Sequence, residues 1–347
     1  MSSRKEAVRD GYARVAREDF GARSDALARI ASAFGYGEED LAAIPAGANM
    51  GLSCGNPVAL ASLKESETVV DLGCGGGLDL FLAARAVGPK GRAIGIDMTP
   101  EMVALARRNA AAGGYANVEV HHASLEVMPL TSGSVDCVIS NCVLNLVDDK
   151  DAALAEIFRV LKPGGRLAIS DIALKCPLPV ELAADVTAWV SCIAGALTVE
   201  NTLQKLGRAG FIHAQVVPTG ADLNVYKEAG KAGCCGSKAS EEPVPDEAEA
   251  SCCPPKSAEN AKEGCCAPKA SEDTPGCCAP ASAPEAKPSC CASAQGVTAA
   301  PSVEATSGEI ASGFHEDLRQ ALQAFDLNAY AAAVRIFALK PQGDPRP

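Results

Sequence analysis

The chain has 347 residues and a formal net charge of −12 at pH 7, and 48% of its residues are hydrophobic. This length accommodates one large domain or two small ones, with ample apolar material for a core. The acidic balance and the lack of a basic cluster argue against a nucleic-acid partner. No apolar run approaches the roughly 18 residues that a membrane-spanning helix needs.

The first ten residues, M-S-S-R-K-E-A-V-R-D, are charged and lack the apolar core of a secretion signal. We therefore expect a cytoplasmic protein without a membrane anchor. In such a reducing compartment the 16 cysteines should be thiols, not a disulfide framework.

The N-terminal segment, residues 1–45, is charged and rich in alanine, and its apolar residues recur at helical spacing. This pattern predicts one or two amphipathic helices that end near Pro45. Residues 46–57, A-G-A-N-M-G-L-S-C-G-N-P, should form a loop that carries Cys54 among small residues. Taken alone, a single loop cysteine is most often an inert small side chain. A short helix is expected at 60–63.

The central segment, residues 67–171, alternates strands and helices, which predicts an α/β fold with a mostly parallel, doubly wound sheet covered on both faces. The turn-forming stretch L-K-P-G-G at 161–165 should end a helix and restart a strand. The expected strands are 68–72, 92–97, 118–121, 135–140 and 166–172, and the expected helices are 78–87, 100–112 and 150–160.

A glycine-rich turn follows the first of these strands, in V-V-D-L-G-C-G-G-G-L-D-L at 69–80. Glycines let the backbone approach a ligand closely, and the helix that follows offers free N–H groups. The dinucleotide fingerprint G-x-G-x-x-G would need a glycine where Leu78 stands. The pattern here is D-x-G-x-G-x-G from Asp71, which resembles the first motif of the class I S-adenosylmethionine (SAM) methyltransferases with their Rossmann-like fold.

Ligands of open α/β sheets bind at the carboxyl ends of the strands. The glycine turn should hold the methionine part of SAM, and the carboxylate that ends strand 92–97 should take the ribose hydroxyls. Residues 124–126, after the third strand, are placed to contact the adenine edge. The residues assigned to the cofactor are Asp71, Gly73, Gly75, Asp97, Met98, Leu125, Glu126 and Asn141.

The C-terminal part departs from this alternation. A helical stretch holding Trp189 and Cys192 precedes a helix to about 209 and a strand at 211–218. A helix at 315–325 and a strand at 330–339 end the chain, and we expect that strand to lie beside 211–218.

Between the strand at 211–218 and the helix at 315–325, residues from about 230 to 308 are mainly Ala, Pro, Ser, Glu, Lys and Gly, with five adjacent cysteine pairs. Such a composition predicts disorder, because too little apolar surface can be buried. The expected organisation is an N-terminal helical segment with the Cys54 loop at 1–66, a SAM-binding core with a helical element at 67–228, a disordered cysteine-rich insertion at 229–310, and a C-terminal helix and strand at 311–347.

Three cysteines outside the pairs lie where a substrate would meet the cofactor. Cys142 directly follows strand 135–140, Cys192 lies on the element that should cover the same mouth of the sheet, and Cys54 is in the loop before the first strand. Converging thiolates suit a soft, thiophilic centre. Zinc is the alternative, but no C-x-x-C or Cys/His spacing supports it outside the repeats. Cys74 and Cys137 are interpreted as small core residues.

Five segments together carry a more specific resemblance: A-N-M-G-L-S-C-G-N-P, V-D-L-G-C-G-G-G-L-D, I-G-I-D-M-T, I-S-N-C-V-L-N-L and S-C-I-A-G-A-L. Over roughly residues 40–228 the chain resembles the arsenite methyltransferases. The resemblance implies that Cys142 and Cys192 hold trivalent arsenic and that Cys54 takes part in thiol–disulfide exchange and methylation. Family members often carry another N-terminal cysteine, and residues 1–53 contain none.

The implied activity is methyl transfer from SAM to arsenite, or to a thiol adduct of it, giving mono- or dimethylated arsenicals in arsenic detoxification. Arsenic supplies its own lone pair, so no general base is needed. Methylation formally oxidises arsenic, so a thiol reductant such as thioredoxin or glutathione must return electrons through a disulfide. A monomer is expected. The alternatives are a C- or O-methyltransferase of a small metabolite and a protein that binds thiophilic metals or metalloids through its cysteine pairs.

Overall fold

The structure is a computed structural model that describes residues 3–18, 24–228 and 314–343. The cysteine-pair segment lies outside the described residues, so the expectation of disorder there is not addressed. The described residues belong to one compact unit. None of their helices is long and apolar enough to cross a membrane.

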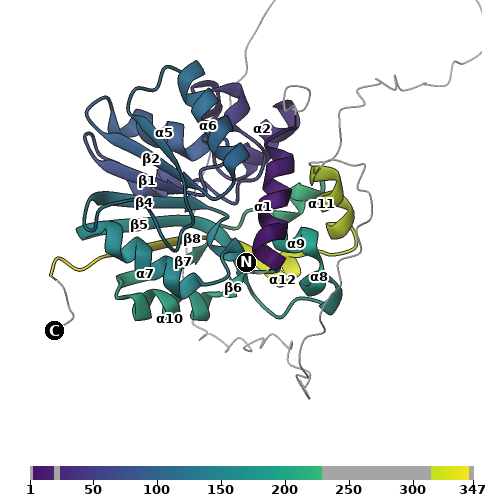
Figure 1. The fold of residues 1–347 in the computed structure, drawn as a ribbon. Helices are drawn as coiled ribbons and strands as arrows, with labels where there is room; N and C mark the ends of the chain where they lie inside the picture. Colours follow the sequence, from purple (N-terminus) through teal and green to yellow (C-terminus); the bar gives the residue numbers. More distant parts are fainter. Residues whose placement is uncertain (1–2, 19–23, 229–313, 344–347) are drawn as a thin grey trace, which may run out of the picture. The chain divides into compact units, whose positions relative to one another are not determined.

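A single mixed sheet forms the centre of the unit, with the strand order β3-β2-β1-β4-β5-β8-β7 and the short β6 paired to β5 (Figure 1). Strands β1 to β5 run parallel, whereas β8 is antiparallel to both β5 and β7. The strands are β1 Thr68–Leu72, β2 Arg92–Asp97, β3 Val118–His122, β4 Val135–Asn141, β5 Leu161–Leu174, β6 Leu197–Thr198, β7 Ile212–Pro218 and β8 Ala331–Leu339.

Helices cover both faces of the sheet. Successive side chains of a strand point to opposite faces, so apolar residues of one strand pack against helices on both sides. On β1, Val69 packs in a cluster with residues of α4 and α5, and Val70 packs in another with residues of α7 and α10. The helices beside the sheet are α4 Pro57–Ala61, α5 Leu78–Val87, α6 Pro100–Ala112, α7 Lys150–Val160 and α10 Val199–Ala209. The predicted doubly wound α/β class is confirmed.

Local chemistry fixes where these helices begin. The side chain of Asn56 accepts from the N–H of Ala59 at the start of α4, and Asp149 accepts from Ala152 at the start of α7, both at 2.9 Å. Pro100 occupies the first turn of α6, where its missing N–H costs nothing. The predicted central helices and most strand bounds are confirmed within a residue or two.

The predicted turn at 161–165 is wrong, because β5 already begins at Leu161. Leu161 pairs with Val135, and the next pair joins Cys137 to Arg166, so the intervening residues bulge out of register. The N–H of Gly164 donates to the carbonyl of Lys340, and the N–H of Lys340 donates to that of Gly165. A partner from the far end of the chain thus extends the strand through a glycine-rich stretch.

The last strand fulfils its prediction by lying between β5 and β7, so the chain returns to the sheet after the cysteine-pair segment. The final elements of the chain are η4 Leu223–Glu228, α11 Phe314–Leu322 and α12 Leu327–Tyr330.

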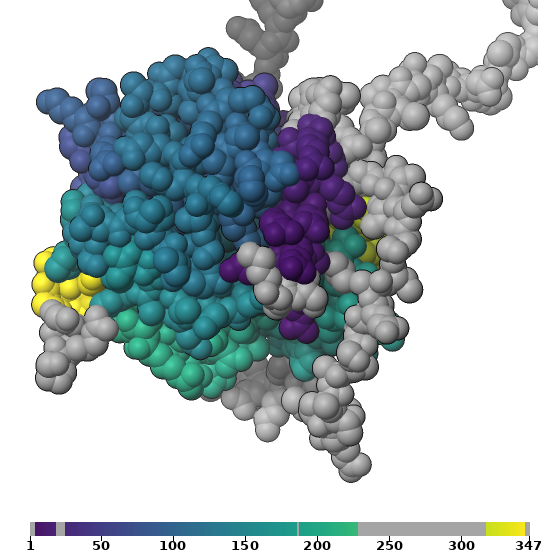
Figure 2. All heavy atoms as spheres, viewed as in Figure 1, coloured from purple at the N-terminus to yellow at the C-terminus, as the bar shows by residue number. Residues whose placement is uncertain are grey.

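A further group of helices lies at the carboxyl ends of the strands, where α1, α9 and α11 contact one another. Figure 2 shows α1 in purple across this side of the molecule. The described residues of the N-terminal segment, 3–18 and 24–45, form three helices, not one or two, and Cys192 follows α9 in a turn instead of lying in a helix. The additional elements are α1 Ser3–Val15, α2 Ser24–Ala33, α3 Glu38–Ala42, η2 Ala46–Ala48, η3 Leu144–Leu146, α8 Val180–Ala184 and α9 Val186–Val190.

Candidate active site

A pocket at the carboxyl ends of β1, β2 and β4 is lined by all eight residues that the sequence assigns to SAM. Its glycine turn has left-handed backbone at Gly73 (φ +64°) and Gly75 (φ +50°), a region that side chains disfavour. A Cβ atom on Gly75 would lie 2.7 Å from Met50 Cε, so a side chain here would also collide with the pocket wall. The glycines are therefore needed for both the turn and the space.

Asp97 closes this turn from the end of β2. One carboxylate oxygen accepts from the N–H of Gly75 at 3.0 Å, and the other accepts from the N–H of Thr99 at 2.9 Å, beside the start of α6. These bonds fix the carboxylate in the pocket wall, where it is 7% exposed. Burial raises its pKa above the ordinary value.

Two more buried acids share the pocket. Burial raises the pKa of Asp79 to about 6, even though Asn141 and Tyr36 donate hydrogen bonds to its carboxylate. The pKa of Asp71 is raised well above its usual value, first by burial and then by the charges of Asp79 and Asp97. Three carboxylates so close together favour a cation between them. The pocket therefore fits SAM, whose sulfonium and amino groups are both positive.

Asp79 was missed at the level of the sequence, although it stands in the first turn of α5 within the glycine motif. Lys5 was missed as well, since no function was assigned to the first helix. Its ammonium lies 3.1 Å from Glu126 Oε1, and Lys5 and Val8 of α1 line the pocket together with Glu126. Leu125 and Glu126 lie on the turn closed by the bridge between Ser124 and Val127.

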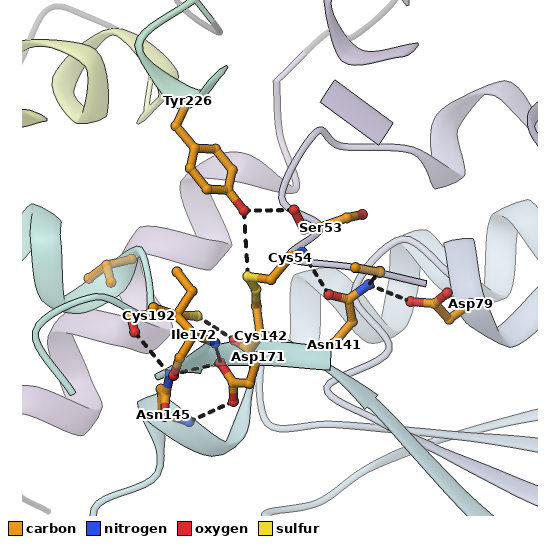
Figure 3. The surroundings of a disulfide bond; sticks show 12 residues. Ser53, Cys54, Asp79, Asn141, Cys142, Asn145, Asp171, Ile172, Cys192 and Tyr226 are labelled. Atoms are coloured by element: carbon orange, nitrogen blue, oxygen red, sulfur yellow. Dashed lines mark hydrogen bonds between the residues drawn. A yellow bond between two sulfur atoms is a disulfide. The ribbon is translucent and has the colours of Figure 1, made fainter. Parts of the chain in front are cut away.

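Asn141, at the end of β4, connects this pocket to the Cys54 loop (Figure 3). Its amide nitrogen donates to Asp79 at 2.9 Å, and its amide oxygen accepts from the N–H of Cys54 at 2.9 Å. The loop approaches β5 closely, since a Cβ on Gly55 would lie 2.8 Å from Ser170 Oγ. One side chain thus holds both the cofactor pocket and the position of Cys54.

Cys54, Cys142 and Cys192 line a second, smaller cavity together with Tyr12, Leu52, Ser191, Tyr226 and Leu318. The three cysteines are 1%, 4% and 2% exposed, so all three side chains are buried. The thiol of Cys192 donates to the carbonyl of Cys142. Three segments far apart in the sequence therefore bring their sulfurs to one place.

Cys54 and Cys142 form a disulfide, so the expectation that all cysteines are thiols is wrong for this pair. The physical reason lies in the tertiary structure: their Cα atoms are 5.8 Å apart, a separation that a disulfide spans. Cys192 keeps a free thiol. Cys74 and Cys137 lie in core clusters as predicted, although Cys74 also touches the SAM pocket.

The backbone at Cys142 and at Cys192 is strained. Cys142 has φ +56° and Cys192 has φ +67°, which costs residues with side chains about 1–2 kcal/mol each. Asn145 fastens the two loops to β5, because its amide nitrogen lies 2.7 Å from the carbonyl of Ile172 and 3.2 Å from that of Cys192. Asn145 was not identified from the sequence, although it belongs to the motif S-N-C-V-L-N-L.

Asp171 on β5 is the other residue that sequence reasoning missed. Its carboxylate and the sulfurs of Cys54 and Cys142 all lie within 4.8 Å of one another. Burial raises the pKa of Asp171 to about 7. The sequence did carry a signal for it: Asp171 is an acid near the carboxyl end of β5, the strand next to β4, just as Asp97 is an acid at the end of β2.

The two cavities share a wall. Tyr12 of α1 and Leu52 of the Cys54 loop line both the SAM pocket and the thiol cavity. The hydroxyl of Tyr12 donates to the carbonyl of Val190 at 3.3 Å, which holds α1 against the turn that carries Cys192. A methyl donor and a thiol-bound acceptor would therefore be neighbours.

Comparison with known proteins also indicates a methyltransferase. Residues 63–210 match a family model described as a methyltransferase domain. The arsenite methyltransferase of Halobacterium salinarum is 45% identical over 184 residues, which are 53% of this chain and 47% of that protein. That of Aquipseudomonas alcaligenes is 38% identical, over 45% of this chain and 47% of the relative. The chain thus spans about half the length of the curated relatives it matches.

Among solved structures, an arsenic (III) S-adenosylmethionine methyltransferase from Chlamydomonas reinhardtii is 30% identical and aligns over 59% of this chain and 69% of that one, with a TM-score of 0.43. The sheet, the glycine turn and the matching domain define a class I SAM-dependent methyltransferase. Within that class, the chain is similar in sequence to the arsenite methyltransferases over about half of its length.

Proposed function

We propose that this protein transfers the methyl group of SAM to trivalent arsenic bound by Cys54, Cys142 and Cys192. The observation that supports this most directly is the buried cavity of three cysteines that shares Tyr12 and Leu52 with the SAM pocket. A carbon or oxygen acceptor would need no such set of sulfurs. The products would be mono- or dimethylated arsenicals, in keeping with a role in arsenic detoxification.

SAM, when bound, supplies an electrophilic methyl group on a positively charged sulfur. The residues of the pocket would bind and orient it: Asp97 would accept from the ribose hydroxyls, and Leu125 and Glu126 would contact the adenine. The buried acids would balance the positive charge. Asp71, Gly73, Gly75, Met98 and Asn141 would hold the methionine part at the glycine turn.

The thiol cavity binds the substrate. Three thiolates replace the hydroxides or the thiols that arrive with arsenic, and the displaced ligands leave with the cysteine protons. Arsenic bound to three sulfurs keeps a lone pair, which is the nucleophile, so the protein needs no general base. Its contribution is to hold the acceptor beside the donor pocket and to exclude water.

The cysteines supply the electrons that return arsenic to the trivalent state. Attack on the methyl group raises arsenic formally from As(III) to As(V), and return to As(III) requires two electrons. Cys54 and Cys142 supply them by forming the disulfide that their positions permit. An external thiol reductant, thioredoxin or glutathione, then restores both thiols. We infer a monomer that acts in the cytoplasm, where such reductants are available.

Arsenic speciation tests the proposal. The reduced protein is incubated with SAM and arsenite, next to a Cys142→Ser/Cys192→Ser variant and a Cys176→Ser control, since Cys176 lies outside the cavity. We expect methylated arsenic from wild type and control, and none from the double variant. Wild-type protein that binds SAM but leaves arsenite unmethylated would contradict the proposal and point to a small-metabolite acceptor.

A further inference from the structure

The potential ligand atoms of the thiol cavity also suit metal ions other than trivalent arsenic. The sulfurs of Cys54 and Cys142 and a carboxylate oxygen of Asp171 all lie within 4.8 Å of one another, and all three residues are buried. Tetrahedral zinc with sulfur ligands holds its sulfurs about 3.8 Å apart, given Zn–S distances of about 2.3 Å. The two sulfurs are bonded to each other in the structure, and reduction of the disulfide frees both to take such positions around one ion, beside the carboxylate of Asp171.

Asp171 also has the supporting contacts of a metal-binding carboxylate. Its Oδ1 accepts from the amide nitrogen of Asn145 at 2.8 Å and from the N–H of Ile172 at 2.9 Å (Figure 3). Its Oδ2 accepts from the N–H of Asn145 at 3.3 Å, which leaves lone-pair capacity on that oxygen. Carboxylates that bind metals are held in this way by neighbouring donors.

The charges around the site suit a divalent cation. Two thiolates and a carboxylate bring three negative charges into a closed cavity, which a doubly charged ion partly neutralises. One negative charge then remains, and the ammonium of Lys150 acts electrostatically on Asp171. This ammonium donates to the carbonyls of Asn145 at 3.2 Å and Val147 at 2.8 Å. Cys192 lines the same cavity and offers a fourth ligand.

We propose that the reduced cavity binds a soft divalent cation, zinc or cadmium, through Cys54, Cys142 and Asp171, with Cys192 as the fourth ligand. Such an ion competes with arsenite for the same thiols. The two ligands differ in one respect: arsenite takes sulfur alone, whereas the divalent ion also uses the oxygen of Asp171. This inference concerns binding and does not depend on the proposed methyl transfer.

The disulfide must be opened first, and a phosphine does this without itself offering thiols to the metal. The phosphine and one water give two thiols and a phosphine oxide, so the two electrons that reduce the disulfide come from phosphorus. Trp189 is the one tryptophan of the chain and lies three residues before Cys192. Its fluorescence is therefore the readout chosen for this cavity.

The experiment titrates the reduced full chain with cadmium in a chelator buffer that fixes the free ion concentration, so that ions taken by the cysteine pairs do not alter it. Arsenite is titrated in parallel, and Asp171→Asn is compared with wild type. We expect the variant to bind cadmium at least roughly tenfold more weakly and arsenite within about twofold of wild type. Equal weakening of both ligands, or unchanged cadmium affinity, would overturn the proposal.

A second measurement covers the case in which Asp171→Asn does not fold. The ten paired cysteines between Cys234 and Cys291 are replaced by serine in the full chain, which keeps Cys54, Cys142, Cys192 and Asp171. Cadmium-113 NMR of this protein then distinguishes sulfur from mixed sulfur–oxygen coordination. A resonance in the mixed range is expected, and an all-sulfur resonance or none would refute the assignment of Asp171.

Discussion

The SAM pocket and the thiol cavity lie side by side but are built differently. The pocket takes its principal residues from short motifs at the ends of successive parallel strands, and three of its acids lie within 27 residues of one another, from Asp71 to Asp97. The cavity takes its residues from α1, the Cys54 loop, the end of β4, the turn after α9, η4 and α11. The candidate cofactor pocket is thus encoded locally, and the thiol cavity depends on the assembled fold.

The two sites also differ in how they treat charge. The pocket gathers buried carboxylates, which suits a cationic donor, whereas the cavity gathers cysteine sulfurs and aromatic walls beside Asp171, which suits a thiophilic ligand. Changes at one site should therefore affect one ligand and spare the other. Three predictions test this separation.

The largest effect is expected from Asp97→Asn. The substitution places an amide NH2 group against the N–H of Gly75 or Thr99, removes a charge, and takes an acceptor from the ribose. Hydrogen bonds to a charged group contribute about 1.5–3 kcal/mol, so SAM affinity should fall by roughly ten- to a hundredfold. Isothermal titration calorimetry measures it. Arsenite binding by Trp189 fluorescence should stay within about twofold.

Asp151→Asn is the matched control for that variant, because Asp151 is exposed and lies outside both cavities. It should bind SAM as wild type does. If Asp97→Asn weakened arsenite as much as SAM, the two sites would not be separable in the way that their construction indicates.

An intermediate effect is expected from pH. Asp79, with a pKa of about 6, is charged above that value and neutral below it. Binding of a cationic donor favours the charged form, so SAM affinity should fall as the pH drops through about 6, by at most roughly tenfold per unit for one proton. Calorimetry between pH 5 and 8 measures the profile.

Asp79→Asn should flatten this profile, since it removes the titrating group and keeps the shape of the side chain. An unchanged slope in the variant would assign the proton to another group, with Asp71 the nearest candidate. Arsenite binding should not follow the Asp79 profile in either protein.

The smallest effect is expected from Tyr226→Phe in the thiol cavity. The hydroxyl of Tyr226 lies 3.4 Å from Cys54 Sγ and donates to the carbonyl of Ser53 at 2.6 Å, and the ring stacks on Phe34 at 5.4 Å. Phenylalanine keeps the stacking but loses the hydroxyl that positions Cys54. A neutral hydrogen bond contributes about 0.5–1.5 kcal/mol, so arsenite should bind roughly two- to tenfold more weakly.

Tyr115→Phe is the matched control, because Tyr115 also stacks on a phenylalanine and donates to a carbonyl, at Phe81 and Ala43. Trp189 fluorescence should give wild-type arsenite affinity for it. SAM affinity should be unchanged in both variants, and a loss of SAM binding in Tyr226→Phe would show that the tyrosine supports the whole fold and not Cys54.

Much of the fold followed from the sequence. Strand and helix alternation in the centre predicted β1 to β5, and the strand character of 330–339 predicted its return beside β7. The errors occurred where a distant partner decides the outcome. The glycine stretch before Arg166 looked like a turn because its backbone partner, Lys340, is far along the chain. The stretch around Cys192 was predicted to be helical. Asp185 does cap a helix there, but that helix, α9, ends at Val190, and Cys192 lies in the turn that follows.

The sequence by itself determined which residues meet in the candidate cofactor pocket, because each is at a strand end or in the turn that follows, and parallel strands bring such ends to one edge of the sheet. It also singled out the three cysteines. Only the tertiary structure decided that Cys54 and Cys142 are close enough for a disulfide, and that Asp171, Asn145 and Tyr226 surround them. Those contacts join residues separated by up to 172 positions in the chain, and no local pattern encodes the packing that brings them together.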